Sequence, residues 1–585
     1  MILVFGGTTE GRVAAKVLDE SGASYWYSTR GDLQEIQLAH GHHVTGAMEV
    51  PEMVTFCHEH EIRLIVDAAH PFAVNLHRNI VDLAGQIEVS IIRYDRIYPP
   101  HDKDIVCCQD YDDAINQLKA HGINRLLALT GVNTIAILRG YWHDHNCWFR
   151  ILNRDESLAG AQKAGFPTDR LVYYEKDDTT SLIKRLQPQA IITKESGTSG
   201  RFSEKVTAAR QAGIKVFVVE RPEYPTAQNV AVVNINGPHG LRRAVEKLLP
   251  EFYPLHSGLT TGTCATAAAI AATVQMTTGE TPSSVPVVLP DGETIDVDVT
   301  YSDGYAAVFK QAGDDPDVTN GIEIRAHVEP SDHFEILGGE GVGRFTVPGF
   351  DFPPGEAAIN KAPRQMMRDN IKGNVSITIS VPQGAEIARR TFNPRLGIEG
   401  GISIIGVSGI VKPFSEEAFV ASIRKCMQVA KASGSDRVVI NSGGKSERFV
   451  KAQYTDLPQQ AFVEYGNYIG DTLAIANELD IKNVTLGVML GKAVKLAAGN
   501  LDTHSRHTTM DKDFVMGMLH EAGINIDISD LTLARELWDR IPQEKLQDFA
   551  TVVINHCNRY CSPLLPNGNL TILLITDTGT IFKQQ

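Results

Sequence analysis

Short apolar runs alternate with amphipathic helical stretches through the first 250 residues of the chain. The runs have the length of strands, and glycine or polar residues follow most of them. Because helices join consecutive strands, we expect parallel sheets that are covered on both faces. The pattern restarts after Tyr98-Pro99-Pro100, so we predict two α/β lobes, at residues 1–98 and 99–252. The predicted strands are Met1–Phe5, Ser24–Ser28, Arg63–Ala68, Val89–Tyr94, Arg125–Thr130, Cys147–Leu152, Ala190–Thr193 and Lys215–Val219.

A different sequence pattern begins at residue 253, where predicted helices, glycine turns and strands of alternating pattern are mixed. Examples are the alternating runs Glu293–Thr300 and Ser376–Ser380. This mixture predicts an α+β domain at residues 253–430. From Arg437 onward the alternation of apolar strands and helices returns, with strands expected at Val438–Asn441 and Val484–Val488. We therefore predict a final α/β domain at residues 431–585.

The charge balance and the lengths of the apolar runs disfavour several classes of function. The chain has 585 residues, with 55 Lys and Arg against 70 Asp and Glu, and a formal net charge of −15. A nucleic-acid binder usually carries a basic face. No apolar run reaches the roughly 18 residues of a membrane span, and the first residues lack the basic start and apolar core of a signal peptide. We therefore expect a cytoplasmic protein with no nucleic-acid or membrane partner.

Cysteine and histidine spacing gives no sign of a structural metal. The eight cysteines form no CxxC pair, and Cys557 and Cys561 have no second pair with which to complete a zinc site. Reduced thiols are the expected state. His40, His42 and His43 are close in sequence, but a solvated turn explains them better than a metal site. We predict no protein-bound metal.

The clearest cofactor signal follows the first predicted strand. A helix N-terminus and nearby glycines suit a pyrophosphate, so the lobes are expected to be Rossmann-like. Thr8 takes the place of the second glycine of GxGxxG, so the strict fingerprint is absent, and a tight turn without a ligand is the alternative. The candidate cofactor-binding residues of this turn are Gly6, Gly7, Thr8, Thr9, Glu10 and Gly11.

The end of the second predicted strand bears on which nicotinamide is used. An acidic residue there commonly holds the ribose of NAD, whereas a basic residue accommodates the 2′-phosphate of NADP. The strand ends in Thr29 and Arg30. This pair favours NADPH over NADH, and the alternative is an ordinary surface arginine.

Two further segments follow predicted strands, which is where α/β sheets bind their ligands. In Asp67–Ala73, His70 is either a donor of a proton or hydrogen bond, or a residue that closes a turn. The second segment is Lys194–Gly200, followed by Arg201 and Lys205. We expect both segments beside a cleft between the lobes.

Glycine-rich segments with single charged residues recur in the second half and indicate loops that face a ligand. A capped helix start carries Thr261, Gly262 and Thr263. The acidic turn Gly313–Gly321 suits a metal, a polar ligand or plain solvation. The run Asn393–Gly406 is the longest of these segments.

A glycine turn also follows the predicted strand at Val438. A P-loop would need glycine at position 439, which is Val439, so an ATPase is disfavoured. Such a turn can instead cradle the adenosine or methionine part of S-adenosylmethionine. The candidate cofactor-binding residues are Gly443, Gly444, Ser446 and Glu447.

Residues 1–250 resemble the precorrin-6A reductase family. Gly6–Arg12, Asp67–Ala73, Lys194–Gly197 and Arg221-Pro222 carry the resemblance, in that order. It implies hydride delivery from NADPH or NADH to a conjugated double bond of a tetrapyrrole in the cleft, with His70 as a candidate catalytic residue. The candidate substrate-binding residues are Lys194, Ser196, Gly197, Arg201 and Lys205.

Residues 255–510 resemble the cobalt-precorrin-5B C1-methyltransferase family, through Gly313–Gly321, Asn393–Gly406 and Gly499–Ser505. The resemblance implies methyl transfer from S-adenosylmethionine to ring carbon C1, a displacement governed by alignment and desolvation. Asp315 and Glu399 are the candidate catalytic residues. The candidate substrate-binding residues are Thr261, Gly262, Thr263, Arg364, Arg395 and Lys412.

Together the resemblances imply a bifunctional enzyme of cobalamin ring synthesis, since methylation at C1 yields the precorrin-6A that the reductase consumes. The implied partners are cobalt-precorrin substrates, and a homo-oligomer and transient contacts with other enzymes of corrin synthesis stay open. The alternative is an NADP-sensing regulatory module fused to a small-molecule kinase or a scaffold domain. Binding of S-adenosylmethionine but not ATP would exclude the kinase.

Overall fold

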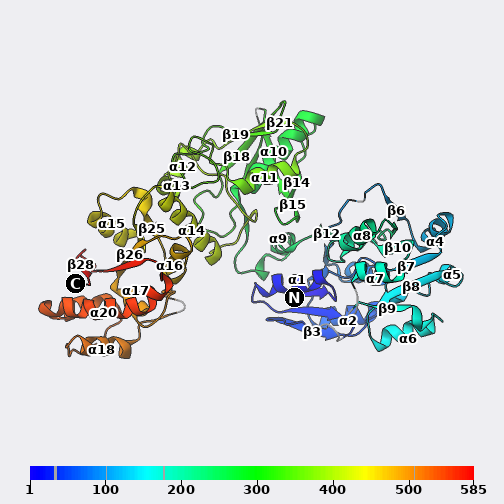
Figure 1. Ribbon diagram of the computed structural model, residues 1–585, viewed down its shortest axis with the longest axis horizontal. Helices are drawn as coiled ribbons and strands as arrows, with labels where there is room; N and C mark the ends of the chain where they lie inside the picture. Colours follow the sequence, from blue (N-terminus) through cyan, green and yellow to red (C-terminus); the bar gives the residue numbers. More distant parts are fainter. Residues whose placement is uncertain (32–35, 101, 175–177, 303, 506–507, 585) are drawn as a thin grey trace. The chain divides into compact units, whose positions relative to one another are not determined.

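The computed structural model describes residues 1–31, 36–100, 102–174, 178–302, 304–505 and 508–584 (Figure 1). Contacts divide the chain into two compact units. The first is Met1–His256 with Val288–Asp296, and the second is Ser257–Val287 with Val297–Gln585. None of the described helices is long and apolar enough to cross a membrane.

The first unit contains two parallel sheets, as predicted. In the first sheet the strand order is β12-β5-β4-β1-β2-β3, which is the order typical of dinucleotide-binding sheets. Ile2 and Val4 pack with α1 and α9, while Leu3 and Phe5 pack with α2 and α3. Both faces are therefore buried, as a continuous apolar strand requires. The elements are β1 Ile2–Phe5, β2 Tyr25–Thr29, β3 Gly41–Thr45, β4 Leu64–Asp67, β5 Ser90–Tyr94, β12 Val232–Ile235, α1 Thr9–Asp19, α2 Val50–Glu59, α3 Val74–Ile87 and α9 Pro238–Leu248.

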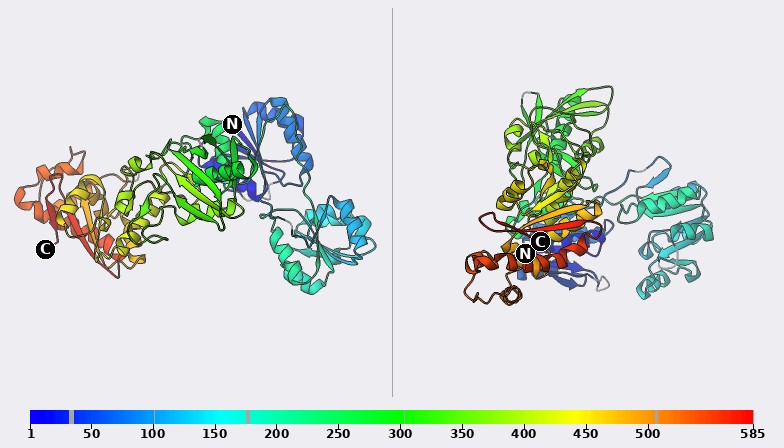
Figure 2. Two further views of the ribbon diagram at one scale, coloured as in Figure 1. Left: turned by 90° about the horizontal axis from the view of Figure 1, so that it is seen from above. Right: turned by 60° about the vertical axis from the view of Figure 1, so that its left-hand side comes forward.

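The second sheet of this unit has the order β6-β11-β10-β7-β8-β9 and is also parallel throughout. Its strands and helices are drawn in cyan to blue-green in Figure 2. One of its cores includes α4, α5 and α6, and the other includes α7 and α8. The elements are β6 Ile105–Cys108, β7 Arg125–Ala128, β8 Asn146–Ile151, β9 Leu171–Tyr173, β10 Ala190–Lys194, β11 Lys215–Val219, α4 Tyr111–Ala120, α5 Arg139–Trp142, α6 Asp155–Lys163, α7 Thr179–Leu186 and α8 Phe202–Gln211.

Two expectations for this unit are corrected. The chain returns to the first sheet at its end, because β12 pairs with β5, so residues 232–248 belong with the first lobe and not with the second. The histidine-rich segment is not a turn, since His42 and His43 lie in the edge strand β3. An exposed edge strand needs no alternation of apolar residues, which is why the pattern missed it. The division into four domains otherwise remains a proposal.

The second unit begins with mixed α+β structure. The long helix α10, Thr261–Thr278, packs on a five-stranded sheet of order β16-β17-β18-β21-β19. Short strand pairs complete this part. The elements are β13 Gly258–Leu259, β14 Ser284–Val288, β15 Thr294–Asp298, β16 Thr300–Ser302, β17 Tyr305–Phe309, β18 Glu323–Pro330, β19 Glu335–Gly338, β20 Arg344–Phe345, β21 Val375–Ser380, β22 Ile398–Glu399, β23 Ile410–Val411, α11 Lys361–Asn370, α12 Gly384–Ala388 and α13 Asn393–Leu396.

The α/β pattern returns in the rest of this unit, as predicted. A sheet of order β25-β24-β26-β27-β28 is parallel except for β28. Its larger core includes α14, α16, α17, α18 and α20, and its smaller core includes α15 (Figure 1). The elements are α14 Glu416–Ala432, β24 Val438–Asn441, α15 Gly444–Gln453, β25 Phe462–Glu464, α16 Ile469–Glu478, β26 Asn483–Met489, α17 Leu490–Ala497, α18 Lys512–Glu521, α19 Leu537–Arg540, α20 Leu546–Cys561, β27 Asn569–Ile575 and β28 Ile581–Lys583.

Candidate functional site

The glycine turn after β1 is partly structural and partly open. A Cβ atom on Gly6 or on Gly11 would come closer than 3.0 Å to the fully buried Tyr27 side chain, so these two glycines let α1 pack on β2. Gly7 differs, because it has a φ of +86° and a Cβ atom added to it would meet no other atom within 4 Å. Gly7 and Thr9 are exposed. The turn therefore leaves main chain accessible at Gly7, beside the N-terminus of α1.

This turn lies at the point where the strand order reverses. β1 is flanked by β2 and β4, so the loops after β1 and β4 diverge there and form the crevice in which such sheets bind ligands. The Thr8 hydroxyl accepts the Gly11 N–H at 2.9 Å and donates to the Ala68 carbonyl at 2.6 Å. Thr8 thereby joins the two loops, and its hydroxyl acts within the protein.

His70 and the carboxylate before it belong to a buried polar network. Asp67 accepts hydrogen bonds from His77 Nδ1 at 2.7 Å and from Arg93 Nε at 3.3 Å, and its side chain is fully buried. Burial, with nearby Arg96 and Lys194, lowers the pKa of His70 to about 3. The imidazole is therefore neutral near pH 7.

The tautomer of His70 follows from its partner. The Phe72 N–H donates to His70 Nδ1 at 3.2 Å, so a neutral ring carries its proton on Nε2. His70 is thus suited to donate a hydrogen bond through Nε2, whereas the protonated acid form is scarce. His70 was predicted to donate either a proton or a hydrogen bond, and this geometry favours the hydrogen bond.

An arginine that the sequence analysis missed joins the two lobes. The side chain of Arg96 is 7% exposed, pairs with Glu10 Oε2 at 3.1 Å and donates to the Ser196 carbonyl at 2.8 Å. Ser199 donates to the other Glu10 oxygen. Gly197 has a φ of +66° and packs on Arg96. Glu10, Ser196 and Gly197, predicted as ligand-binding residues, therefore also hold the lobes together.

Four cations gather beside this junction. Lys205 is 8% exposed, and no hydrogen bond or ion pair links its ammonium group to another described residue. Burial lowers its pKa to about 8, and the neighbouring charges of Arg150, Arg96 and Lys194 act in the same direction. Such like charges repel one another unless an anion lies between them. An anion would be stabilised beside Lys205, although Arg96 already pairs with Glu10 and Arg150 already contacts Thr179, so ligand binding here stays a prediction.

Two of these four cations were predicted from the sequence. Lys194 and Lys205 were predicted, whereas Arg201 lies apart, 73% exposed and paired with Glu204. Arg150 lies in β8 and is 5% exposed. A charged residue inside an otherwise apolar strand was the available signal for it. No comparable local signal marked the arginine after β5.

The predicted nucleotide residues at the end of β2 lie side by side in different environments. Thr29 is 5% exposed, and its hydroxyl donates to the Gly31 carbonyl at 2.8 Å and contacts His43 Nε2 at 2.8 Å. Arg30 is exposed. Of the two, only the arginine side chain extends into solvent, where a phosphate could reach it.

One group of potential metal ligands occurs in the first unit. Among the described residues, His239, Asp291 and Glu293 bring three ligand atoms within 4.8 Å of one another. Glu293 already accepts the backbone N–H groups of His239 and Gly240 at the start of α9. Burial raises its pKa to about 7. The carboxylate thus caps a helix, and the expectation of no protein-bound metal stays a prediction.

In the second unit, several predicted segments converge on the start of α10. Thr261 accepts the Ile405 N–H at 2.8 Å, and Thr263 donates to the Gly409 carbonyl at 2.6 Å. A Cβ on Gly262 would come closer than 3.0 Å to Pro363. Loops 403–411 and 358–363 are therefore anchored at this helix. The hydroxyls of Thr261 and Thr263 act within the protein, and their contact with substrate stays a prediction.

Two carboxylates of the acidic turn Gly313–Gly321 each bind another residue of the protein. Asp317 pairs with the buried Lys310 at 2.7 Å, which together with two bonds from Thr319 holds the pKa of Asp317 below its usual range despite burial. Asp315 accepts the Phe414 N–H at 3.1 Å. The other candidate catalytic residue, Glu399, is exposed on β22. Asp315 lies in a turn and Glu399 on a strand, so the two candidates belong to different segments of the chain.

The basic residues that were predicted to bind substrate in this unit lie in separate segments. Arg364 donates to the Ile359 carbonyl at 2.8 Å and stacks 4.4 Å from the Phe352 ring centre, so it braces its own loop. Lys412 is exposed just after β23. Of these two, Lys412 has the more accessible side chain.

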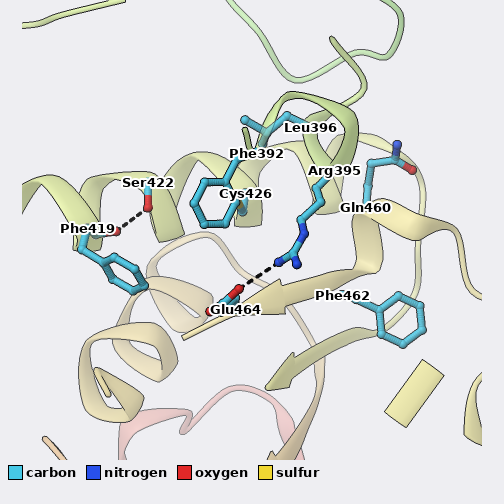
Figure 3. Close-up of a pocket in the computed structure, with 9 residues that line it drawn as sticks. All are labelled: Phe392, Arg395, Leu396, Phe419, Ser422, Cys426, Gln460, Phe462 and Glu464. Atoms are coloured by element: carbon cyan, nitrogen blue, oxygen red, sulfur yellow. Dashed lines mark hydrogen bonds and ion pairs between the residues drawn. The ribbon is translucent and has the colours of Figure 1, made fainter. Parts of the chain in front are cut away.

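Arg395 lines a small pocket between α13, α14 and β25 (Figure 3). Its guanidinium pairs with Glu464 at 2.9 Å and with Glu447 at 3.0 Å. The cavity volume is about 10 Å³, at the lower limit for one water molecule. A predicted substrate residue and a predicted cofactor residue, Glu447, are thus paired with each other. Either residue could contact a ligand only if the ion pair between them were broken.

The turn after β24 lies at the carboxyl edge of the last sheet. Ser446 is fully buried, and its hydroxyl donates to the Gly443 carbonyl at 2.9 Å, so it closes the turn. Gly444 is exposed with a φ of +51°. At the same edge, Lys492 donates to the Gly466 carbonyl and to Asn467 Oδ1 at 2.6 Å. Of the four predicted cofactor residues in this turn, Gly444 is exposed, whereas Gly443, Ser446 and Glu447 are buried, and their contact with a cofactor stays a prediction.

Comparisons with known proteins match the two halves separately. The family model described as "Precorrin-6x reductase CbiJ/CobK" matches residues 1–235, and the model described as "CbiD" matches residues 250–413. The cobalt-precorrin-5B C(1)-methyltransferase of Prosthecochloris aestuarii is 41% identical over 346 residues, covering 55% of this chain and 94% of that protein. Its counterpart from a Geobacillus species is 40% identical over 325 residues, covering 52% and 88%.

Two solved structures are also similar. A cobalamin biosynthesis protein of Archaeoglobus fulgidus is 29% identical, covers 43% of this chain and 83% of its own, and has a TM-score of 0.26. A precorrin-6A reductase is 20% identical, with coverages of 42% and 97% and a TM-score of 0.35.

Proposed function

Because this bifunctional enzyme of cobalamin synthesis joins a member of the precorrin-6x reductase family to a member of the cobalt-precorrin-5B C(1)-methyltransferase family, we propose two reactions for it. The first half reduces cobalt-precorrin-6A with a reduced nicotinamide. The second half methylates cobalt-precorrin-5B at C1 with S-adenosylmethionine. The substrates are tetrapyrroles that carry several carboxylates.

The observation that carries the reductase proposal is the cation cluster beside the open glycine turn. Arg96 belongs to the cluster and also contacts Glu10 in the first turn of α1, so a ligand anion at Lys205 would lie close to a dinucleotide at Gly7. A bound reduced nicotinamide supplies the hydride. The protein holds ring carboxylates with Lys194 and Lys205, which orients the acceptor carbon. Neutral His70 donates a hydrogen bond through Nε2.

NADPH is the proposed cofactor. The end of β2 offers Arg30 in solvent, and β2 itself contains no carboxylate that would bind the ribose of NAD. The phosphate of NADPH would add two negative charges beside this arginine. NADH would lack this contact.

The methyltransferase proposal needs no activated nucleophile. A sulfonium donor reacts by displacement, so the protein contributes alignment and exclusion of water. We propose that the backbone of Gly443 and Gly444 holds S-adenosylmethionine at the carboxyl edge of the last sheet. Glu399 remains a proposed catalytic residue and Lys412 a proposed substrate contact. Arg364 and Arg395 could bind substrate only after giving up their present partners.

One incubation tests both reactions. The purified chain is supplied with cobalt-precorrin-5B and S-adenosylmethionine, and NADPH is added after methylation is complete. Mass spectrometry is expected to show a gain of one methyl group, then of two hydrogens. NADPH that binds but is not oxidised when the tetrapyrrole is supplied would favour the sensor, and ATP consumption would favour the kinase. Either result would refute the proposal.

A further inference from the structure

The segment 405–414 of the second unit, which includes the short strand β23, exposes three large apolar side chains. Val407 is 83% exposed, Phe414 is 64% exposed and Ile405 is 46% exposed, all within ten residues. The loop is well anchored, because the Gly409 carbonyl accepts both the Thr260 N–H and the Thr263 hydroxyl. An anchored loop that exposes several large apolar groups indicates a binding surface.

The backbone of Phe414 is held in a costly conformation. Its φ of +53° lies in the left-handed region, which bulky residues rarely adopt. Asp315, 99 positions earlier in the chain, accepts the Phe414 N–H at 3.1 Å and so holds this conformation. Strain of this kind persists where the surrounding structure enforces it, and it concentrates at ligand sites.

We propose that Phe414, positioned by Asp315, stacks on the flat face of the cobalt-precorrin in the methyltransferase half. Ile405 and Val407, nine and seven positions earlier in the chain, are the other large apolar side chains that this segment exposes. This inference rests on the proposed function, which supplies a flat macrocycle as the ligand. It assigns to Asp315 the role of a positioning residue that acts through Phe414.

The charges around this loop match such an occupant. Lys412 is exposed two residues before Phe414. Lys361 is exposed next to Asn360, whose N–H donates to the Ile404 carbonyl at 3.0 Å. An apolar surface with lysines at its rim complements a ring that is apolar on its faces and carboxylated at its edge. A second copy of this acidic chain is less well matched.

The hydrogen bond to Phe414 gives a clear prediction for Asp315 variants. Asparagine retains an oxygen that accepts the N–H but has no charge and no basic oxygen, whereas alanine has no acceptor. If Asp315 only positions Phe414, Asp315→Asn should bind the macrocycle nearly as tightly as the wild type does. Asp315→Ala should bind it more weakly. If Asp315 transfers a proton, both variants lose turnover.

The experiment uses the full chain and two readouts. Binding of cobyrinic acid, a stable cobalt corrin, is measured by equilibrium dialysis, and methylation of cobalt-precorrin-5B is followed by mass spectrometry. Phe414→Ala is expected to raise both Kd and KM about tenfold with little change in kcat, as loss of one aromatic stacking contact predicts. Phe414→Trp should bind within about twofold of the wild type. Leu533→Ala, which truncates an exposed leucine elsewhere, is the matched control and should change nothing.

Each other outcome counts against a specific statement. Wild-type binding that Phe414→Ala leaves unchanged overturns the stacking surface. Loss of kcat in Asp315→Asn at unchanged Kd overturns the positioning role. A dimer that Phe414→Ala dissociates without any change in Kd identifies the surface as an interface between copies instead. Failure of the wild type to bind the corrin and to transfer a methyl group refutes the proposed function itself.

Discussion

The buried ammonium of Lys205 predicts a variant that gains stability and loses function. Lys205→Met keeps a long flexible side chain and removes the charge. Lys205 is 8% exposed, and its ammonium group lies near the charges of Arg150, Arg96 and Lys194. Its removal should therefore stabilise the first unit, while weakening the grip on an anionic macrocycle. Such opposed effects are characteristic of binding sites.

The size of the stability gain follows from the pKa. Burial lowers the pKa of Lys205 from 10.5 to about 8. Each pKa unit corresponds to about 1.4 kcal/mol, so the folded state is penalised by about 3 kcal/mol at pH 7. The penalty is fully present below pH 8, where lysine is charged in both states. It decreases as the pH rises from about 8 to 10.5 and vanishes when both states are neutral.

Calorimetry of the full chain at pH 7 and at about pH 10 measures this difference. The transition of the first unit is expected to rise by about 6–12 °C at pH 7 in Lys205→Met, since about 2–4 °C corresponds to 1 kcal/mol in a unit of this size. At pH 10 most of the rise should disappear. The exposed Lys215 on β11 gives the matched control, Lys215→Met, which should leave the transition unchanged.

The reductase assay completes the test. The KM for the tetrapyrrole should rise tenfold or more in Lys205→Met, because one partner of a buried charge pair is lost in the complex. A transition that does not rise at pH 7, or a rise that persists undiminished at pH 10, would refute the buried unpaired ammonium. A higher transition with an unchanged KM would instead place the macrocycle elsewhere.

Three further predictions follow from the first unit. Gly6→Ala should destabilise it by about 2 kcal/mol through a clash with the neighbouring tyrosine, whereas Gly140→Ala, with no atom near its Cβ position, should not; urea unfolding compares them. Asp67→Asn should cost about 3–5 kcal/mol, because Arg93 is left buried without its counter-charge; an unchanged unfolding midpoint would contradict this. Arg30→Ala should raise the KM for NADPH about tenfold and leave that for NADH unchanged; equal effects on both would exclude a role at the 2′-phosphate.

Local pattern was enough to predict many of the buried strands and the two-part organisation, although it missed the edge strand β3. The apolar run Ile2–Phe5 has no polar residue that would prefer solvent, so it predicted a strand buried on both faces. The change in texture near residue 253 separated the two units because parallel and mixed sheets need different patterns of burial. The glycine turn and the resemblances predicted a cofactor site after the first strand, and this site stays a prediction.

Contacts between residues far apart in the chain could not be predicted from local pattern. The return of β12 to β5, the meeting of Arg96 with Glu10, and the bond from Phe414 to Asp315 all join residues far apart in the chain. Each depends on which strands become neighbours, and a residue's own sequence surroundings do not encode that. The pattern supplied Lys205 as a candidate, but it took the fold to surround this lysine with like charges.

The same division explains why some candidates changed role. Thr261 and Thr263 carry hydroxyls that suit a ligand or a helix cap, and the local pattern permits both uses. The fold brings carbonyls of the 403–409 loop to these hydroxyls, so they bind protein. The order of residues establishes which chemical groups are present and which segments are buried. Folding in three dimensions settles which of those groups already have partners, because hydrogen bonds and ion pairs form only between atoms that come within reach of each other.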